Sequence, residues 1–277
     1  MVLCNLHTHT ERSDGIGSAE DVIRIALEKG FRTLGFSDHV YTPWGTDYTL
    51  PEDPDGYIRE NLQFAEKYKD RIEIVCGIEN EFDCWQADKR YQYNIGSRHC
   101  LPVSDGHMLI DETPEILEAG IAAYYDGRGA LAAKDYYMHL AEDADRFRPQ
   151  IIGHFDLIRK FNRSSRFFDE NSASYRRAAL EAAEAAGSTG AVFEVNSSNI
   201  ARKRRHILYP ADFILRFILE RGYPVILGSD AHDPSLLDGG FREAETRLWG
   251  LGFRYITVWE NGRFVQKELA EQMTVNA

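Results

Sequence analysis

The chain has 277 residues, 43% of them hydrophobic and 12% aromatic, which is enough for a substantial core. Its formal net charge of −12 argues against a dedicated nucleic-acid binder, because such proteins use a basic surface to displace counterions from phosphates. We expect neither a signal peptide nor a membrane span, since no stretch approaches roughly 20 apolar residues. The four cysteines show no CxxC spacing, so we expect reduced thiols in a cytoplasmic protein.

Short apolar runs alternate with longer amphipathic runs along the chain. We expect strands at 2–6, 33–36, 72–78, 93–97, 150–153, 191–195, 224–228 and 255–259. We expect helices at 18–29, 55–67, 113–123, 131–147, 172–186, 211–220 and 236–249. Ser18 is the expected N-cap of the first helix, and Gly30 is its expected stop.

This alternation predicts a mostly parallel sheet covered by helices. About seven strand–helix repeats in one chain fit a barrel better than two separate domains. We therefore expect a single domain over residues 1–277, with a helical insertion at roughly 111–148 before the fifth strand.

Residues of the metal-binding type cluster where these strands end. His7 and His9 are two positions apart at the end of the first strand, so both rings can point to one face. Later strands end at His39, Glu79, His99, His154, and the pair Asp230 and His232; Glu194 and Asn196 end the sixth strand, and Asp14 lies in the first loop. In α/β barrels the active site lies on the face where the strands end. Imidazole and carboxylate ligands together suit Zn, Mn or Fe, so we expect two to three such ions.

Several of these assignments have alternatives. His107, in a turn, competes with His99 as a ligand. Asp14 precedes Gly15 and could instead be a turn residue. Glu194 and Asn196 could be pocket residues, groups that support the ligands, or purely structural.

Seven short motifs occur in a fixed order along nearly the whole chain: NLHTHT (5–10), GFSDH (35–39), GIE (77–79), GSRH (96–99), GHFD (153–156), EVN (194–196) and GSDAH (228–232). The ordered set resembles the PHP (polymerase and histidinol phosphatase) superfamily, and within it the histidinol-phosphate phosphatase branch. Two features depart from the family pattern: Arg98 stands where relatives often carry an apolar residue, and residues 196–202 follow the usual asparagine-threonine-x-glycine pattern only loosely.

The resemblance implies a distorted (β/α)7 barrel, similar to a TIM barrel, with a trinuclear metal centre. Carried over by position, the first ion takes His7, His9, Glu79 and Asp230; the second shares Glu79 and adds His99 and His154; the third takes Asp14, His39 and His232.

The function that the resemblance implies is hydrolysis of L-histidinol phosphate to L-histidinol and phosphate in histidine biosynthesis, with a hydroxide that bridges two metals as the nucleophile. His232 or Asp230 is the expected acid for the leaving alkoxide. Arg159, Arg202 and Asn196 are the expected substrate contacts, although Arg159 could instead pair with a nearby acid and Arg202 could belong to a solvated basic loop.

Other functions stay open at this stage. The same barrel could act on another small phosphomonoester or on phosphotyrosine, because a fold does not determine its substrate. A nuclease and a non-enzymatic binding protein are further alternatives, and the acidic charge argues against the nuclease. The sequence does not predict an oligomeric state.

Overall fold

The computed structural model describes residues 4–44, 54–203 and 206–269. Within these ranges the main sheet has nine strands in the order β1-β2-β3-β4-β7-β8-β9-β10-β11. These strands are β1 (Cys4–Asn5), β2 (Thr33–Phe36), β3 (Glu73–Glu81), β4 (Tyr93–Ser97), β7 (Ile151–Ile152), β8 (Val192–Asn196), β9 (Val225–Gly228), β10 (Tyr255–Glu260) and β11 (Arg263–Glu268). A separate hairpin pairs β5 (Cys100–Val103) with β6 (Gly106–Leu109).

The main sheet is largely parallel, as expected from the strand–helix alternation. Parallel pairing joins neighbouring strands from β1 to β10, and β11 pairs antiparallel with β10. The chain just after β1 also meets the chain just after β9, where Thr8 and Ala231 form an isolated parallel bridge. There the backbone N–H of His9 donates to the carbonyl of Ala231 at 2.9 Å. The chain segments that follow β1 and β9 are therefore side by side, although they are far apart in the sequence.

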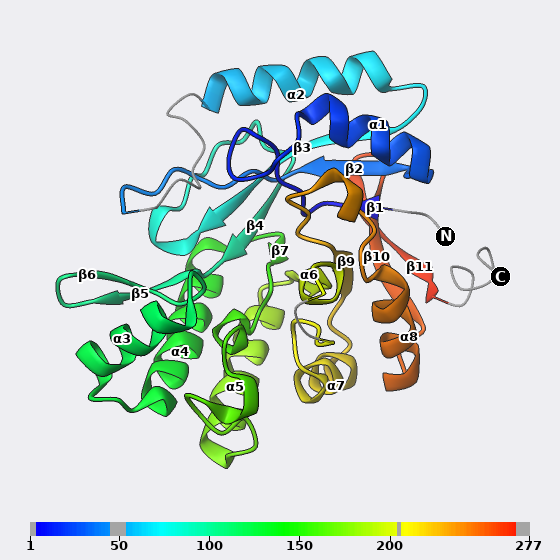
Figure 1. Cartoon of the computed structure of the whole chain (residues 1–277). Coiled ribbons are helices and arrows are strands. Elements are labelled where there is room, and N and C mark those ends of the chain that lie inside the picture. Colours follow the sequence, from blue (N-terminus) through cyan, green and yellow to red (C-terminus); the bar gives the residue numbers. More distant parts are fainter. Residues whose placement is uncertain (1–3, 45–53, 204–205, 270–277) are drawn as a thin grey trace.

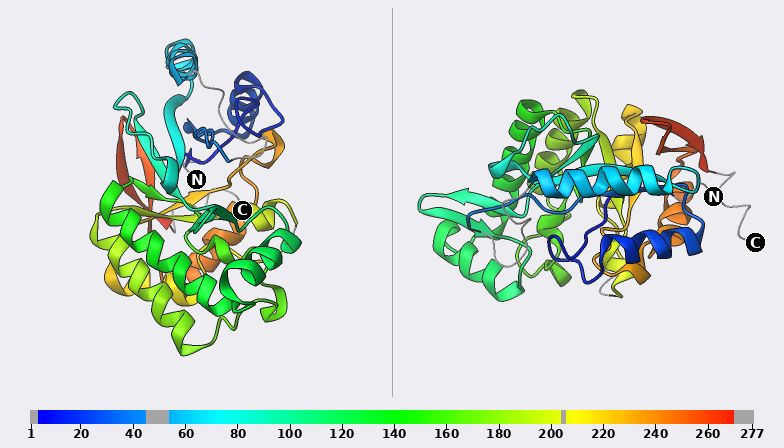
Figure 2. Two further views of the ribbon diagram at one scale, coloured as in Figure 1. Left: turned by 90° about the vertical axis from the view of Figure 1, so that its left-hand side faces the viewer. Right: turned by 90° about the horizontal axis from the view of Figure 1, so that it is seen from above.

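Helices cover the strands from two sides. They are α1 (Ala19–Lys29), α2 (Pro54–Tyr68), α3 (Pro114–Tyr125), α4 (Gly129–Phe147), α5 (Ala173–Ser188), α6 (Ser198–Ala201), α7 (Asp212–Arg221) and α8 (Phe241–Leu251). Helices α1 and α2 lie together on one side, and α3, α4, α5, α7 and α8 lie on the other (Figure 1; Figure 2). No helix in the described ranges is both long enough and apolar enough to cross a membrane.

Local chemistry sets the ends of these helices. The side chain of Ser18 accepts from the backbone N–H of Asp21 and so caps α1, as its position before the apolar stripe predicts. Gly30 ends the helix at a φ of 81°, a left-handed conformation that glycine adopts without a steric penalty. Helix α1 thereby returns the chain to the sheet at β2.

A buried tyrosine fastens the centre of the sheet. The Tyr93 hydroxyl donates to the carbonyl of Leu6 at 2.5 Å and lies 3.1 Å from the carbonyl of Phe36. Gly35 and Gly77 leave room for its ring, since a Cβ on Gly77 would lie 2.2 Å from the ring carbon Cζ. The side chain thus ties two strand ends together directly before the residues with metal-binding side chains.

Several predicted boundaries change in the structure. The first strand is Cys4–Asn5, and residues 2–3 lie outside the described ranges. The last predicted helix begins at Phe241 rather than at 236, because Gly240 has a φ of 74°. The β5–β6 hairpin and β11 were not predicted. Pro102 lacks the N–H that a central strand needs and so weakens the strand signal of β5.

Candidate metal centre

The carboxylate of Glu79 lies at the centre of five imidazoles. Glu79 is fully buried near the end of β3. Its two oxygens lie 2.9 Å from Nε2 of His154, 3.0 Å from Nδ1 of His39, 3.2 Å from Nε2 of His7, 3.4 Å from Nε2 of His9 and 3.6 Å from Nε2 of His99. A carboxylate with two acceptor oxygens can serve more than one cation in such a position.

A second carboxylate, Asp230, follows strand β9. Its Oδ1 lies 3.3 Å from Nε2 of His9 and 3.8 Å from Nε2 of His7. The bridge between Thr8 and Ala231 sets this proximity, because it holds the two chain segments in parallel register. His7, His9 and Asp230 together form one group able to hold a metal ion.

Asp14 and His232 form the outer part of the cluster. Oδ2 of Asp14 lies 2.7 Å from Nε2 of His232, and Oδ1 lies 3.6 Å from Nδ1 of His9 and 3.7 Å from Nε2 of His39. These four residues form another group of metal-ligand type. The loop after β1 therefore brings Asp14 to the strand ends.

The structure gathers all nine predicted ligands at one end of the sheet. Their groupings are His7, His9 and Asp230; His7, Glu79 and His154; His39, Glu79 and His99; and His9, Asp14, His39 and His232. Each of the three predicted ligand sets therefore has its members close together. His107 lies apart from them: it stacks on Trp44 with ring centroids 3.6 Å apart, and its Nε2 is 3.5 Å from Asp83.

Two further glutamates orient the imidazoles. Oε1 of Glu194 lies 2.7 Å from Nδ1 of His7, and Oε2 accepts from the backbone N–H of His154 at 2.7 Å. Oε2 of Glu81 accepts from the backbone N–H of His99 at 2.7 Å and lies 3.1 Å from its Nδ1. A carboxylate behind a ligating imidazole fixes its orientation and raises its basicity.

Glu81 was not predicted to belong to this site. The signal is its position two residues after Glu79 on β3, since side chains two apart on a strand share a face. The sequence predicts a strand at 72–78, which leaves Glu81 outside it.

Buried polar atoms without a hydrogen-bond partner indicate that these side chains can hold cations. Among the described residues, Nε2 of His7, both ring nitrogens of His9 and Oε2 of Glu79 are buried and have no hydrogen-bond partner. Buried polar atoms are normally satisfied, so several orphans facing one another need an explanation. Imidazole nitrogen and carboxylate oxygen are the donors that Zn, Mn and Fe accept.

Electrostatics favour the ligand form of two central groups, His9 and Glu79. Burial, with the nearby imidazoles of His232 and His39, lowers the pKa of His9 to about 3, so His9 is neutral at pH 7. Burial acts to raise the pKa of Glu79, but the imidazoles of His7 and the other surrounding histidines outweigh it and hold this pKa well below its usual range. A neutral imidazole and an ionised carboxylate are the forms that bind metals.

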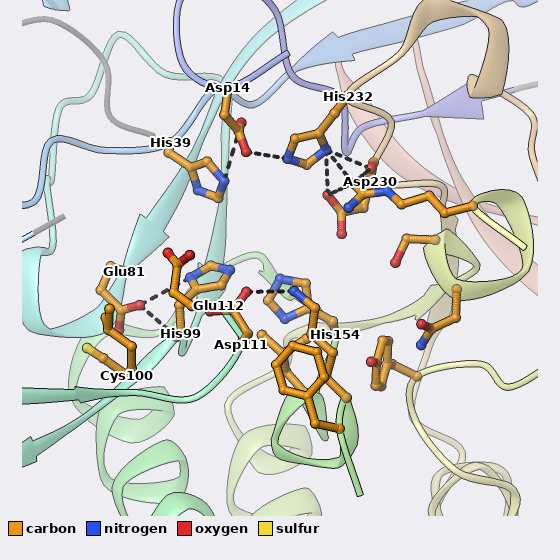
Figure 3. Close-up of a pocket in the computed structure, with 18 of the residues that line it drawn as sticks. Asp14, His39, Glu81, His99, Cys100, Asp111, Glu112, His154, Asp230 and His232 are labelled. Carbon is orange, nitrogen blue, oxygen red and sulfur yellow. Dashed lines mark hydrogen bonds and ion pairs between the residues drawn. The ribbon is translucent and has the colours of Figure 1, made fainter. Parts of the chain in front are cut away.

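The cluster opens into a cavity of about 1040 Å³. Asp14, His39, His99, His154, Asp230 and His232 line it on the cluster side (Figure 3). Trp44, Asp111, Glu112, Lys160, Arg163, Arg166 and Arg202 are among the residues on its other walls. The volume is that of a site for a small molecule.

Of the predicted substrate contacts, Arg202 lines the cavity. Its guanidinium donates to the carbonyl of Asp230 at 2.8 Å and lies 2.6 Å from Nδ1 of His232. Arg202 thus brings a positive charge next to Asp230 and His232.

The other two predicted substrate contacts, Arg159 and Asn196, are not among the residues that line the cavity. Arg159 is buried and donates to Asp156 and to Glu170 at 2.8 Å each. Asn196 is also fully buried; its amide donates to Glu194 at 3.1 Å, and its side-chain oxygen accepts from the backbone N–H of Ser198 at 3.0 Å. Arg159 therefore pairs with acids and Asn196 supports Glu194, because both point into the protein rather than into the cavity.

Comparisons with known proteins agree with this geometry. The family model described as the PHP domain matches residues 5–198. A protein of Schizosaccharomyces pombe named "Probable histidinol-phosphatase" is 26% identical over 94% of this chain and 90% of its own length. A protein of Deinococcus radiodurans with the same name is 28% identical over 92% of this chain and 96% of its own length.

A solved structure shares the fold. The histidinol phosphate phosphatase of Lactococcus lactis, determined in complex with zinc, L-histidinol and phosphate, superposes with a TM-score of 0.69 at 19% identity. The match covers 94% of this chain and 98% of that chain. The likeness supports the mixed α/β fold with a largely parallel sheet.

Proposed function

We propose, from the premise that this chain belongs to the PHP domain family, that it is a metal-dependent phosphomonoesterase which hydrolyses L-histidinol phosphate to L-histidinol and phosphate. The observation that carries the proposal is the set of buried, unsatisfied imidazole and carboxylate atoms that face one another at the strand ends. The names of the two relatives, and the L-histidinol and phosphate bound to the Lactococcus protein, support the choice of substrate.

The fold proposal is a distorted (β/α)7 barrel in one domain over residues 1–277. Seven parallel strands precede β10, and the bridge between Thr8 and Ala231 brings the first of them to the last. This bridge supports closure because it lies between chain segments that the sheet order places far apart.

The ligand sets divide among three proposed cations. His7, His9, Glu79 and Asp230 hold the first; Glu79, His99 and His154 hold the second; and Asp14, His39 and His232 hold the third. When bound, such cations lower the pKa of a water that attacks phosphorus and neutralise the phosphate oxygens. Zn, Fe and Mn all fit this donor set, and zinc is the ion in the Lactococcus structure.

The remaining steps belong to side chains of this chain. Arg202 positions a phosphate oxygen through its guanidinium, which the carbonyl of Asp230 holds in place. The leaving alkoxide takes its proton from His232 or Asp230, both of which line the cavity.

We propose a cytoplasmic location and a small phosphorylated substrate rather than a nucleic acid. Cys4, Cys76, Cys84 and Cys100 are all free, which suits a reducing compartment. The net charge of −12 disfavours a nucleic-acid partner.

A substrate panel tests the proposed function. Purified protein loaded with Zn, Mn or Fe is assayed for phosphate release from L-histidinol phosphate, phosphotyrosine, nucleoside monophosphates and sugar phosphates. We expect the highest kcat/KM on L-histidinol phosphate. A higher kcat/KM on phosphotyrosine or on nucleotides would contradict the proposed substrate and favour one of the rival functions.

A further inference from the structure

A further group of metal-ligand side chains lies outside the metal centre. Asp83 lies in the short 3-10 helix Phe82–Cys84 that follows β3, and Cys100 and His107 belong to the β5–β6 hairpin. One donor atom from each of these three residues lies within 4.8 Å of the other two. None of the three belongs to the ligand sets of the proposed cations, so the proposed function leaves this group without a role.

The strand register explains why two of these side chains meet. In the β5–β6 hairpin Pro102 is opposite His107, and Cys100 lies two residues before Pro102 on the same strand. Side chains two apart on a strand point to the same face, and diagonal neighbours across an antiparallel pair are within reach of each other. The ring of Trp44 stacks on that of His107 with centroids 3.6 Å apart, which fixes the plane of the imidazole.

The spacing of the donor atoms matches that of ligands around one cation. Oδ2 of Asp83 lies 3.5 Å from Nε2 of His107 and 3.7 Å from Sγ of Cys100. The first separation is longer than an N–H···O hydrogen bond, which is about 2.7–3.2 Å. Around a tetrahedral zinc ion, bonds of about 2.0–2.2 Å to nitrogen and oxygen and about 2.3 Å to sulfur place nitrogen roughly 3.4 Å, and sulfur roughly 3.6 Å, from oxygen.

The charges around the group suit a divalent cation. Arg98 is buried, and its guanidinium contacts the carboxylates of Asp83 and Asp143. The pair of Arg98 and Asp143 is neutral as a whole. A Cys100 thiolate and the Asp83 carboxylate then supply the two negative charges that a divalent cation neutralises. The side chains of Asp83 and His107 are 20% and 21% exposed, so a cation can enter from solvent and keep a water as its fourth ligand.

We propose that Asp83, Cys100 and His107 bind a further divalent cation of the zinc type, which fastens the β5–β6 hairpin to the segment after β3. The cation displaces the thiol proton of Cys100 to solvent and takes a thiolate sulfur, an imidazole nitrogen and a carboxylate oxygen as ligands. Zinc accepts this mixed donor set, whereas Mg and Ca prefer oxygen donors. The proposed ligands of the metal centre are imidazoles and carboxylates, so a cysteine ligand distinguishes the two sites.

Titration with Co²⁺ tests this site by spectroscopy, because a cysteine thiolate bound to Co²⁺ gives a charge-transfer band in the near ultraviolet. The full chain is first loaded with zinc at the metal centre, whose proposed ligands contain no thiolate and give no such band. We expect the band in the parent chain and in Cys84→Ser, a control at another free cysteine, and its loss in Cys100→Ser. A parent chain without the band, or a band that survives in Cys100→Ser, would overturn the inference.

His107→Ala gives a second readout at a partly exposed side chain. It should raise the Co²⁺ dissociation constant, read from the same band, about 10-fold or more, because an imidazole ligand is lost. After equilibration with excess zinc and removal of free ions, mass spectrometry should find about one ion fewer in this variant than in the parent chain. His139→Ala is the matched control, since the His139 side chain is 27% exposed on α4, and it should equal the parent chain in both measurements. An unchanged dissociation constant or an unchanged zinc content in His107→Ala would contradict the proposed site.

Discussion

Nδ1 of His7 lies 2.7 Å from Oε1 of Glu194, although the two residues are 187 positions apart in the sequence. A proton on Nδ1 can be donated to Glu194, and the lone pair of Nε2 is then directed toward Glu79 and Asp230. Glu194 therefore decides which nitrogen of His7 is available to a cation.

Replacing Glu194 with Gln should weaken cation binding. The amide keeps the size of the side chain but removes the charge behind His7, so the dissociation constant for Zn should rise about 10- to 100-fold. Competition against a chromophoric chelator measures this constant. The control is Glu181→Gln, which alters an exposed residue of α5. An unchanged zinc affinity in Glu194→Gln would contradict the role given to Glu194.

Replacing His9 with Ala should remove both metal and activity. His9 is near both Glu79 and Asp230, so its loss affects the first proposed cation site directly. We expect the parent chain to contain two to three transition-metal ions by mass spectrometry, and the variant fewer, with activity below about 1% of the parent. His139→Ala on α4 is the control. Full activity in a metal-free preparation of the parent chain would contradict the metal-dependent mechanism.

Arg202 and Arg159 should respond to substitution in opposite ways. Arg202→Ala should lower kcat/KM about 10-fold or more without lowering the free energy of unfolding, because the side chain lines the cavity. Arg159→Ala should lower the free energy of unfolding by about 3–5 kcal/mol, because it leaves the buried Asp156 carboxylate without its guanidinium. Urea unfolding and steady-state kinetics on both variants separate the two roles. A stable but inactive Arg159→Ala variant would restore Arg159 as a phosphate contact.

Replacing Tyr93 with Phe should destabilise the sheet. The carbonyls of Leu6 and Phe36 lose the hydroxyl that they face inside the protein, at a cost of about 1–2 kcal/mol. Urea unfolding gives the difference in free energy. Tyr255→Phe serves as the control because Tyr255 is 52% exposed. If both variants unfold at the same urea concentration, the buried hydroxyl does not contribute in this way.

The buried acid Glu245 in α8 should make stability depend on pH. Burial raises its pKa from 4.5 to about 7, so the folded state binds this proton more tightly than the unfolded state. The contribution of this proton to the free energy of unfolding is complete below pH 4.5 and is lost as the pH rises through about 7. Glu245→Gln removes the charge. The free energy of unfolding of the variant, relative to that of the parent, should therefore rise by on the order of 1–2 kcal/mol from pH 5 to pH 8, after allowance for solvent screening. Urea unfolding at both pH values measures this gain, and a pH-independent difference would contradict it.

Much of the fold, and the gathering of metal-ligand side chains at one end of the sheet, could be predicted from sequence because the signal is local. Apolar runs define the strands, and residues such as His7 and His39 come directly after them. Parallel strands end at one edge, so side chains that follow the strands meet there whichever strands are neighbours. Membership of the PHP domain family was predicted from the same motifs and is confirmed by the family match. The predicted metal-ligand side chains lie close together because the strands they follow end at this common edge.

The roles of the remaining polar residues were decided by contacts that no sequence pattern encodes. Arg159 and Arg202 both precede or follow strand-end motifs, yet Arg159 turns inward to Asp156 and Glu170 while Arg202 reaches the cavity. Glu81 joins the centre because β3 continues three residues beyond the predicted strand. A side chain's partner depends on which distant segment packs against it, so the direction of an arginine or a glutamate is set by tertiary packing. The sequence by itself determined which segments become strands and which imidazole and carboxylate side chains follow them, because both signals are local.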